Sequence, residues 1–135
     1  MKLSYATPGD AYTVLGDESD RSLLLELFSP AFQPVTQVEP LAGGANTFKA
    51  ARGNVTVNLQ IVASIPYSTK AAALAGIATV RAAFTTKKHL KVEQDATVHY
   101  YPNAHLTGYQ PVLKGVTIQH SLSFTTDDLT TEAPA

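Results

Sequence analysis

Two segments in which apolar and polar residues alternate constrain the fold of this chain more than any other feature. Residues 55–63 place Val, Leu, Ile and Ala at every second position, with mostly Thr, Asn and Gln between them. Residues 116–124 repeat the pattern with Val, Ile, His, Leu and Phe. Successive side chains of a strand point to opposite faces, so this period of two predicts strands with one buried side and one solvent-facing side.

One helix is predicted, from Thr69 to about Lys87, because this stretch is rich in alanine, the best helix former. Ser68 is expected to cap its first turn. The basic group Lys87, Lys88 and His89 is expected at its C-terminal end, where the helix dipole favours positive charge. Four apolar residues at helical spacing would face the sheet: Ala73, Ile77, Val80 and Phe84.

The remaining segments contain shorter strand signals and several turn signals. Residues 22–28 fit either a strand buried on both faces or a short helix capped by Ser22, and a strand is favoured. Prolines at 30, 34 and 40 are expected to prevent a long continuation. Strands are also expected over 90–94, 96–101 and 104–108. Turns or breaks are predicted at 52–54, 102–103 and 110–111.

This order of elements predicts an α+β fold. We expect a mostly antiparallel β-sandwich or twisted sheet with one flanking helix at about 69–87. Residues 1–20 are predicted to form an extended N-terminal arm or a short edge strand, residues 21–124 a single β-rich domain, and residues 125–135 a flexible C-terminal tail. A length of 135 residues suits one domain with one core.

Charge is scarce in this chain. Charged residues make up 16% of the sequence and the net charge is -1, whereas about a quarter is usual. An uncharged polar surface loses less hydration when it is buried. The composition therefore favours surfaces covered in an assembly, with a plain monomer as the alternative, and it gives no field that would hold nucleic acid or a membrane.

Cysteine is absent, which excludes disulfides, thiolate nucleophiles and zinc–thiolate sites. It also fits synthesis in a cytoplasm. The first ten residues hold no apolar stretch, so no signal peptide is expected. The aliphatic run at 23–28 is too short to span a bilayer.

The four histidines do not have the spacing of a metal site. His99 and His105 could converge across the turn at 102–103 with Asp95 as a third ligand, but we predict no metal. His120 shares the apolar phase of its strand and is interpreted as a core or interface histidine with one hydrogen bond.

Catalytic constellations are also missing from the sequence. No GxSxG, SxxK or GxGxxG motif occurs, and Gly43-Gly44 is not followed by the Lys-Ser/Thr of a phosphate loop. Two groups of carboxylates are interpreted as solvated, because general acid chemistry needs carboxyls held in a shielded pocket. These groups are Asp17, Glu18 and Asp20, and Asp127 and Asp128. We therefore predict no catalytic, cofactor-binding or metal-binding residues and no enzyme activity.

Tyrosines at strand ends and turns suggest contact surfaces. Tyrosine combines apolar area with a polar tip and is enriched at protein interfaces. The alternative is a platform that stacks sugars or another host-surface ligand, which would make the chain a small binding module. The residues in question are Tyr67, Tyr100, Tyr101 and Tyr109.

The C-terminal third resembles the closing strands of small phage tail proteins. The residues that carry the resemblance run from Tyr101-Pro-Asn-Ala-His-Leu-Thr-Gly-Tyr109 through Lys114-Gly115 to the alternating strand 116–124 that ends in Phe. The preceding order of long strand, alanine-rich helix and strand pair is similar to the tail-tube fold. The resemblance covers residues 48–124.

This resemblance implies a virion structural protein, made in the host cytoplasm, that assembles with itself into rings, expected to be hexameric, and contacts neighbouring tail proteins. The rings would stack through the loop 41–46 and the arm 1–20, and DNA would pass through the channel without specific binding. Terminator, distal tail and baseplate subunits are alternatives, because they share the fold. Two polar sets are expected to line the channel, either Thr56, Asn58 and Gln60, or Thr117, Gln119 and Ser121.

Overall fold

The computed structural model describes the backbone of residues 1–40 and 47–135 and the side chains of residues 1–33 and 55–135. It contains seven strands, a short 3-10 helix η1 (Glu18–Asp20) and one α-helix, α1 (Lys70–Ala83). The strands are β1 (Lys2–Ala6), β2 (Thr13–Asp17), β3 (Leu24–Pro40), β4 (Thr47–Pro66), β5 (Lys88–Gln94), β6 (Thr97–Lys114) and β7 (Thr117–Asp127). The predicted mostly antiparallel β fold with one flanking helix is confirmed.

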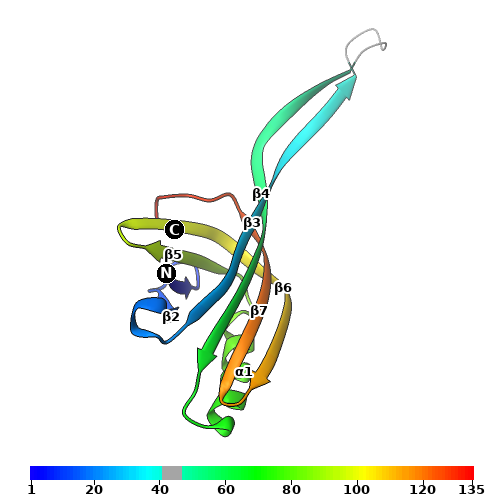
Figure 1. Cartoon of the computed structure of the whole chain (residues 1–135). Helices are drawn as coiled ribbons and strands as arrows, with labels where there is room; N and C mark the ends of the chain where they lie inside the picture. Colours follow the sequence, from blue (N-terminus) through cyan, green and yellow to red (C-terminus); the bar gives the residue numbers. More distant parts are fainter. Residues whose placement is uncertain (41–46) are drawn as a thin grey trace.

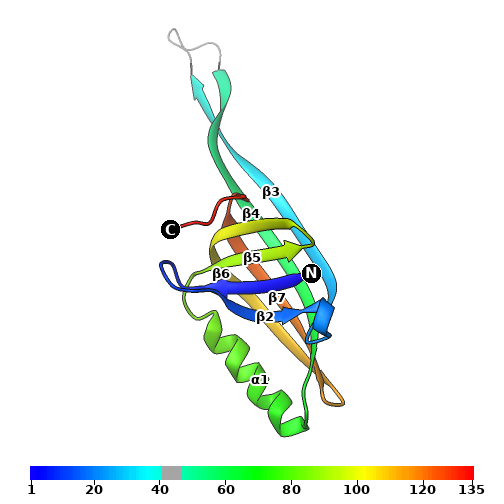
Figure 2. The ribbon, with the colours of Figure 1, turned by 90° about the vertical axis from the view of Figure 1, so that its left-hand side faces the viewer.

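All seven strands belong to one antiparallel sheet with the order β2-β1-β5-β6-β7-β4-β3. Strand β6 pairs with β5 up to Ala104 and with β7 from His105 onward. The sheet bends at this change of partner, and the half that contains β1, β2 and β5 crosses over the half that contains β7, β4 and β3 (Figures 1 and 2). The two halves are joined by one continuous strand.

The bend replaces the turn predicted at Pro102-Asn103. These residues form a bulge within β6, because Leu90 of β5 faces Tyr101 whereas Lys88 faces Ala104. Asn103 has a φ of 53°, a left-handed conformation that asparagine tolerates better than most residues. The predicted turn is therefore wrong, because the chain does not reverse at Pro102-Asn103. The irregular local backbone that the turn residues indicate is present as the bulge.

The core lies between the two halves of the sheet and is built from the alternating strands. On β4 the buried side chains are Val57, Leu59, Ile61 and Ala63, and on β7 they are Ile118, His120, Leu122 and Phe124. Aromatic contacts connect the core across elements, with ring centroids 5.1 Å apart for Phe84 and Phe124 and 5.8 Å apart for Phe28 and Tyr101. The period-two prediction for both strands is confirmed.

Strand β3 confirms a strand in the region 22–28, but Leu24 and Leu27 are exposed, so the strand is not buried on both faces, and it does not stop at the prolines. It continues through Pro30 and Pro34 to Pro40 because it is an edge strand, paired with β4 alone. An edge position tolerates proline, whose missing N–H can face away from the partner strand. Pro111 is accommodated in the same way, since β6 has only β7 as its strand partner there. The predicted break at 110–111 is therefore wrong.

The predicted turn at 52–54 is also absent, because β4 runs through it. Its residues lie at an irregularity in the pairing, where Pro34 faces Val55 and Thr36 faces Ala51. Together β3 and β4 form a long hairpin that projects from the body of the molecule (Figure 1). The loop 41–46, expected to contact a neighbouring ring, lies outside the described residues.

Both terminal segments take part in the sheet. Residues predicted as an arm form β1 and β2, and β2 is an edge strand. At the other terminus, β7 extends to Asp127, and the backbone of Thr130 exchanges two hydrogen bonds with Tyr100, of 2.8 and 3.0 Å. The strand pairing thus crosses both of the boundaries predicted for the central domain.

The helix is shorter than predicted and lies at one end of the molecule (Figure 2). Its N-cap is Thr69, whose side chain accepts a 3.0 Å hydrogen bond from the N–H of Ala72, and not Ser68. It ends at Ala83, so Lys88 and His89 belong to β5 and not to a helix end. Its buried residues are Ala73, Gly76 and Val80, while Ile77 is half-buried.

Candidate functional site: an uncharged sheet face with two open edges

The outer face of β3, β4, β7 and the second half of β6 is the largest functional candidate. The two polar sets that the sequence offered as alternatives lie together on it, because Gln60 of β4 faces Ser123 of β7 and Ser64 faces Gln119. The same rows continue onto β3 through Ser29 and onto β6 through Gln110. The face is therefore a single polar surface across four strands.

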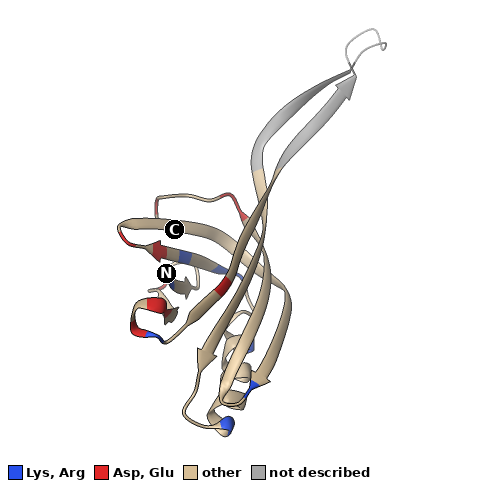
Figure 3. Cartoon of the chain, viewed as in Figure 1, with Lys and Arg blue, Asp and Glu red and all other residues tan. Residues whose placement is uncertain are grey.

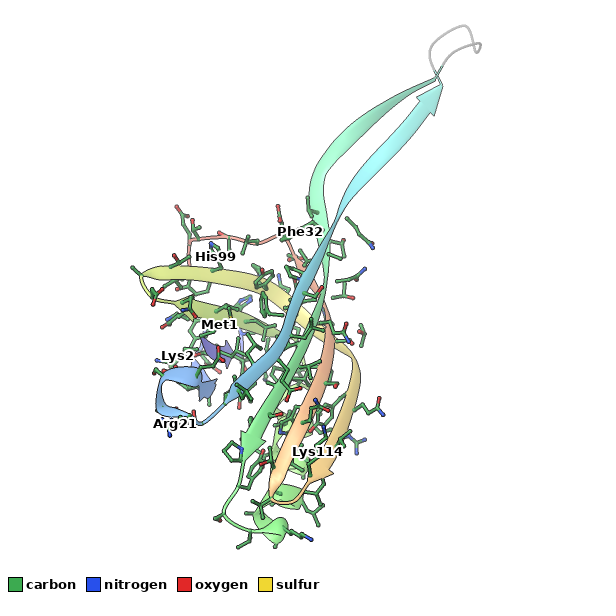
Figure 4. The ribbon with its side chains drawn as sticks, in the orientation of Figure 1. Met1, Lys2, Arg21, Phe32, His99 and Lys114 are labelled. Atoms are coloured by element: carbon green, nitrogen blue, oxygen red, sulfur yellow. The ribbon has the colours of Figure 1, made fainter. Side chains whose placement is uncertain are left out.

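Charged side chains lie only at the margins of this face, within the part of the chain whose side chains are described. Lys114 and Asp127 stand near its two ends, and Glu26 stands on the edge strand β3. Figure 3 shows the strands between them without charge, while most acidic and basic residues lie on the other half of the sheet, on the turns and helices, and on the C-terminal segment. Lys114 also lies near the β6–β7 turn in Figure 4.

Glu26 ties three strands together on this face. It sits at a bulge of β3 between Leu25 and Leu27. Its two carboxylate oxygens accept hydrogen bonds of 2.5 Å from Ser64 on β4 and from Gln119 on β7. These bonds, the one from Ser64 first, lower the pKa of the Glu26 carboxyl below its ordinary value and keep it ionised.

Two edges border the polar face. Strand β3 pairs only with β4, and residues 105–114 of β6 pair only with β7. Apolar side chains are exposed along both edges and at the adjoining turn: Leu24, Leu27, Val112, Leu113 and Val116 are each between 37% and 59% exposed. Edge strands with exposed apolar side chains are sites where another chain can add to a sheet, through the backbone donors that remain beside Pro30 and Pro111.

Behind the polar face, His120 forms a buried cluster with two tyrosines. Its ring is 1% exposed, with Nε2 3.1 Å from the Tyr67 hydroxyl and Nδ1 2.6 Å from the Tyr109 hydroxyl. Burial lowers the pKa of His120 to about 4 and raises that of Tyr109 to about 12. The prediction of a core histidine is confirmed, with two hydrogen-bond partners and not one.

His99 and His105, which the sequence could bring together across a turn, lie apart. His99 lies near the β5–β6 turn (Figure 4), whereas His105 faces Thr125 on the other half of the sheet. No cluster of three potential ligands occurs among the described residues. His89 is buried, where its Nδ1 accepts a 3.1 Å bond from the Asn103 N–H and its Nε2 lies 3.0 Å from the carbonyl oxygen of Ala135.

Asp20, Asp127 and Asp128 are exposed, as predicted, and several of the carboxylates also support local structure. Asp17 caps η1 by accepting from the Ser19 N–H, and Asp20 accepts from the Ser22 N–H. Glu18 pairs with the N-terminal amine at 3.1 Å. Asp127 accepts a 2.7 Å bond from the Asn103 side chain. These roles are structural, and none of these carboxylates pairs with another in a shielded pocket.

The tyrosines do not gather into one exposed platform. Tyr67 and Tyr109 are engaged with His120, and Tyr101 is buried. Tyr100 packs instead against Tyr12, with ring centroids 5.9 Å apart and the Lys91 ammonium 5.4 Å from the Tyr12 ring. Nothing in the local pattern around Tyr12 indicates Tyr100 as its partner, because the two lie on distant parts of the chain.

Comparison with protein-family models and with curated proteins finds no match to this chain. The described residues contain no helix with the length and hydropathy needed to cross a membrane.

Proposed function

We propose that this chain is a structural subunit of a phage tail, in which copies assemble side by side into a ring around a channel through which DNA passes. The observation that carries the proposal is a polar face, uncharged at its centre and with Glu26, Lys114 and Asp127 toward its ends, bounded by two open sheet edges, β3 and the second half of β6. Pairing the β3 edge of one copy with the β6 edge of the next would join these faces into one continuous surface.

The composition of the face suits a channel lining. Amide and hydroxyl groups attract phosphates less than Lys or Arg side chains do, so DNA would slide along them without being held. Their cross-strand neighbours are also uncharged over the centre of the face, as Gln60 and Ser123 illustrate. A heterologous contact between two different edges closes into a ring when the rotation between copies permits it.

The stacked halves of the bent sheet and the helix at one end agree with the sandwich-like tail-tube arrangement that the sequence resembles. We propose this finer classification together with the function, and with it the location of the protein in a virion. Terminator, distal tail and baseplate subunits, which share this fold, are the alternatives to a tube subunit.

The direct test places a charge on each edge. Leu27→Lys on β3 and Val112→Lys on β6 would put an ammonium group into the contact between copies. Leu74→Lys is the matched control, because Leu74 is an exposed leucine on α1, at 56% exposure, away from both edges. Light scattering coupled to size exclusion, followed by negative-stain microscopy, would give the mass and shape of each variant.

We expect rings or tubes from the unmodified chain and from Leu74→Lys, and monomers from the two edge variants. Assembly of the edge variants to the same size would overturn the proposal. A monomeric unmodified chain that binds glycans would instead favour the alternative of a small binding module.

A further inference from the structure

The Tyr67–His120–Tyr109 cluster connects three parts of the fold. Tyr67 lies in the segment between β4 and α1, His120 on β7 and Tyr109 on β6. A neutral imidazole offers one donor and one acceptor, so one tyrosine hydroxyl donates to the ring and the other accepts from it. A neutral ring therefore makes both hydrogen bonds of the cluster without a buried charge.

Among the side chains that the structure describes, no charged group lies where it could stabilise a proton on this ring. Ala63 of β4 and Pro111 of β6 flank His120, and α1 reaches the cluster through Gly76, which packs on Tyr67. Burial is the only cause of the lowered pKa of His120, so no carboxylate acts on it within the described residues. The titratable groups that face it are the two tyrosines.

The helix is attached unevenly to the sheet. Its C-terminal end inserts Val80 and Phe84 into the core cluster. Its N-terminal half buries only the small residues Ala73 and Gly76. A groove between α1 and β2 runs along the helix from Ala72 to Val80. Tyr67 also lines it, so Tyr67 belongs to both the groove and the cluster.

From this geometry we propose that protonation of His120 releases the N-terminal half of α1 from the sheet while Val80 and Phe84 hold its C-terminal end. An imidazolium donates from both nitrogens, so both tyrosine hydroxyls would have to accept. The buried charge then needs water, and water entering from the groove requires Tyr67 to move. Because Gly76 packs directly on Tyr67, the helix moves with it. The device goes beyond the proposed assembly and does not depend on it.

The absence of cysteine allows a direct test with single buried thiols. Ala73→Cys would report on the underside of the helix, where Ala73 is 0% exposed. Ala104→Cys is the control in the body of the sheet, where Ala104 is 1% exposed. Ala104 faces Lys88, the neighbour of the other buried histidine, His89, so the control also reports on acidification near a buried histidine away from α1. The rate at which each thiol is modified would be measured from pH 7 to 3.5 with an aromatic disulfide that also reacts in acid. Dividing each rate by that of the unfolded chain at the same pH removes the pH dependence of the reagent itself.

We expect modification at position 73 to become at least tenfold faster on acidification while that at position 104 stays constant. Adding His120→Gln should abolish the acid step. Tyr67→Phe provides a second test if His120→Gln does not fold, because it deletes one hydroxyl and should raise the rate at position 73 already at pH 7. A parallel rise at 73 and 104, an acid step that survives His120→Gln, or an unchanged rate in Tyr67→Phe would overturn the proposal.

Discussion

Gly76 of α1 lies directly against the ring of Tyr67, so closely that a β-carbon at position 76 would overlap the ring and its hydroxyl. A glycine in the middle of a helix costs roughly 0.5–1 kcal/mol relative to alanine. The close contact explains why glycine occupies this position despite that cost, because only glycine lets the helix backbone approach Tyr67, which is hydrogen-bonded to His120.

Gly76→Ala should therefore lower the free energy of unfolding, even though alanine is the better helix former. Overpacking a close contact costs about 1–3 kcal/mol, which exceeds the gain in helix propensity. Urea denaturation followed by circular dichroism measures the change. Gly108→Ala is the control, since a β-carbon there meets only an ordinary contact at 3.9 Å from Ser123. Equal effects at the two positions would contradict the packing explanation.

Stability should depend on pH through His120. Its pKa is about 4 in the folded chain and 6.5 by reference, so the unfolded chain takes up the proton first as the pH falls. The contribution of His120 to the free energy of unfolding is fully present above about pH 6.5. It falls by roughly 2–3 kcal/mol as the pH decreases towards 4. Denaturation midpoints across this range, compared with those of His120→Gln, would measure it. If the denaturation midpoint of His120→Gln changed with pH as steeply as that of the unmodified chain, groups other than His120 would cause the dependence.

The left-handed backbone at Asn103 should restrict what can replace it. Asn103→Gly removes the 2.7 Å bond to Asp127 but tolerates the φ of 53°. Asn103→Val loses the same bond and adds the strain of a β-branched residue, about 1–2 kcal/mol. Thermal unfolding of both variants separates the two costs, and we expect valine to be clearly the less stable. Similar melting temperatures would indicate that the bulge adopts another conformation.

Cysteines placed on the two edges should identify which edges meet. In the proposed assembly, the double variant Leu27→Cys/Val112→Cys should form disulfides between copies and give a ladder of species on a non-reducing gel. Each single variant should remain mostly monomeric on the gel, because one edge would not meet its own copy. A dimer from either single variant would indicate like-with-like pairing, which closes after two copies and forms no ring.

The sequence predicted those parts of the fold that depend on local periodicity. Residues 55–63 and 116–124 are strands with the expected buried faces, and the alanine-rich segment is the helix. The prolines misled the prediction because their effect depends on tertiary position. Pro30 and Pro111 are tolerated where a strand has a partner on one side only, and no local pattern reveals which strands lie at an edge.

The candidate site could be predicted only in part. Alternation placed Gln60 and Gln119 on solvent-facing sides, but it could not show that both belong to one surface, since that depends on β4 pairing with β7. The partners of His120 could not be predicted either, because Tyr67 and Tyr109 are separated from it by 53 and 11 positions along the chain.

Because strand β6 belongs to both halves of the sheet, it can transmit a mechanical load between them. A load applied along its second half, beside β7, passes to β5 through the covalent backbone and not through side-chain packing alone. The joint at Asn103 is braced by its hydrogen bonds to His89 and Asp127. Tension on the half of the sheet that contains β7, β4 and β3 would thus be shared with the half that contains β1, β2 and β5 before any strand separates.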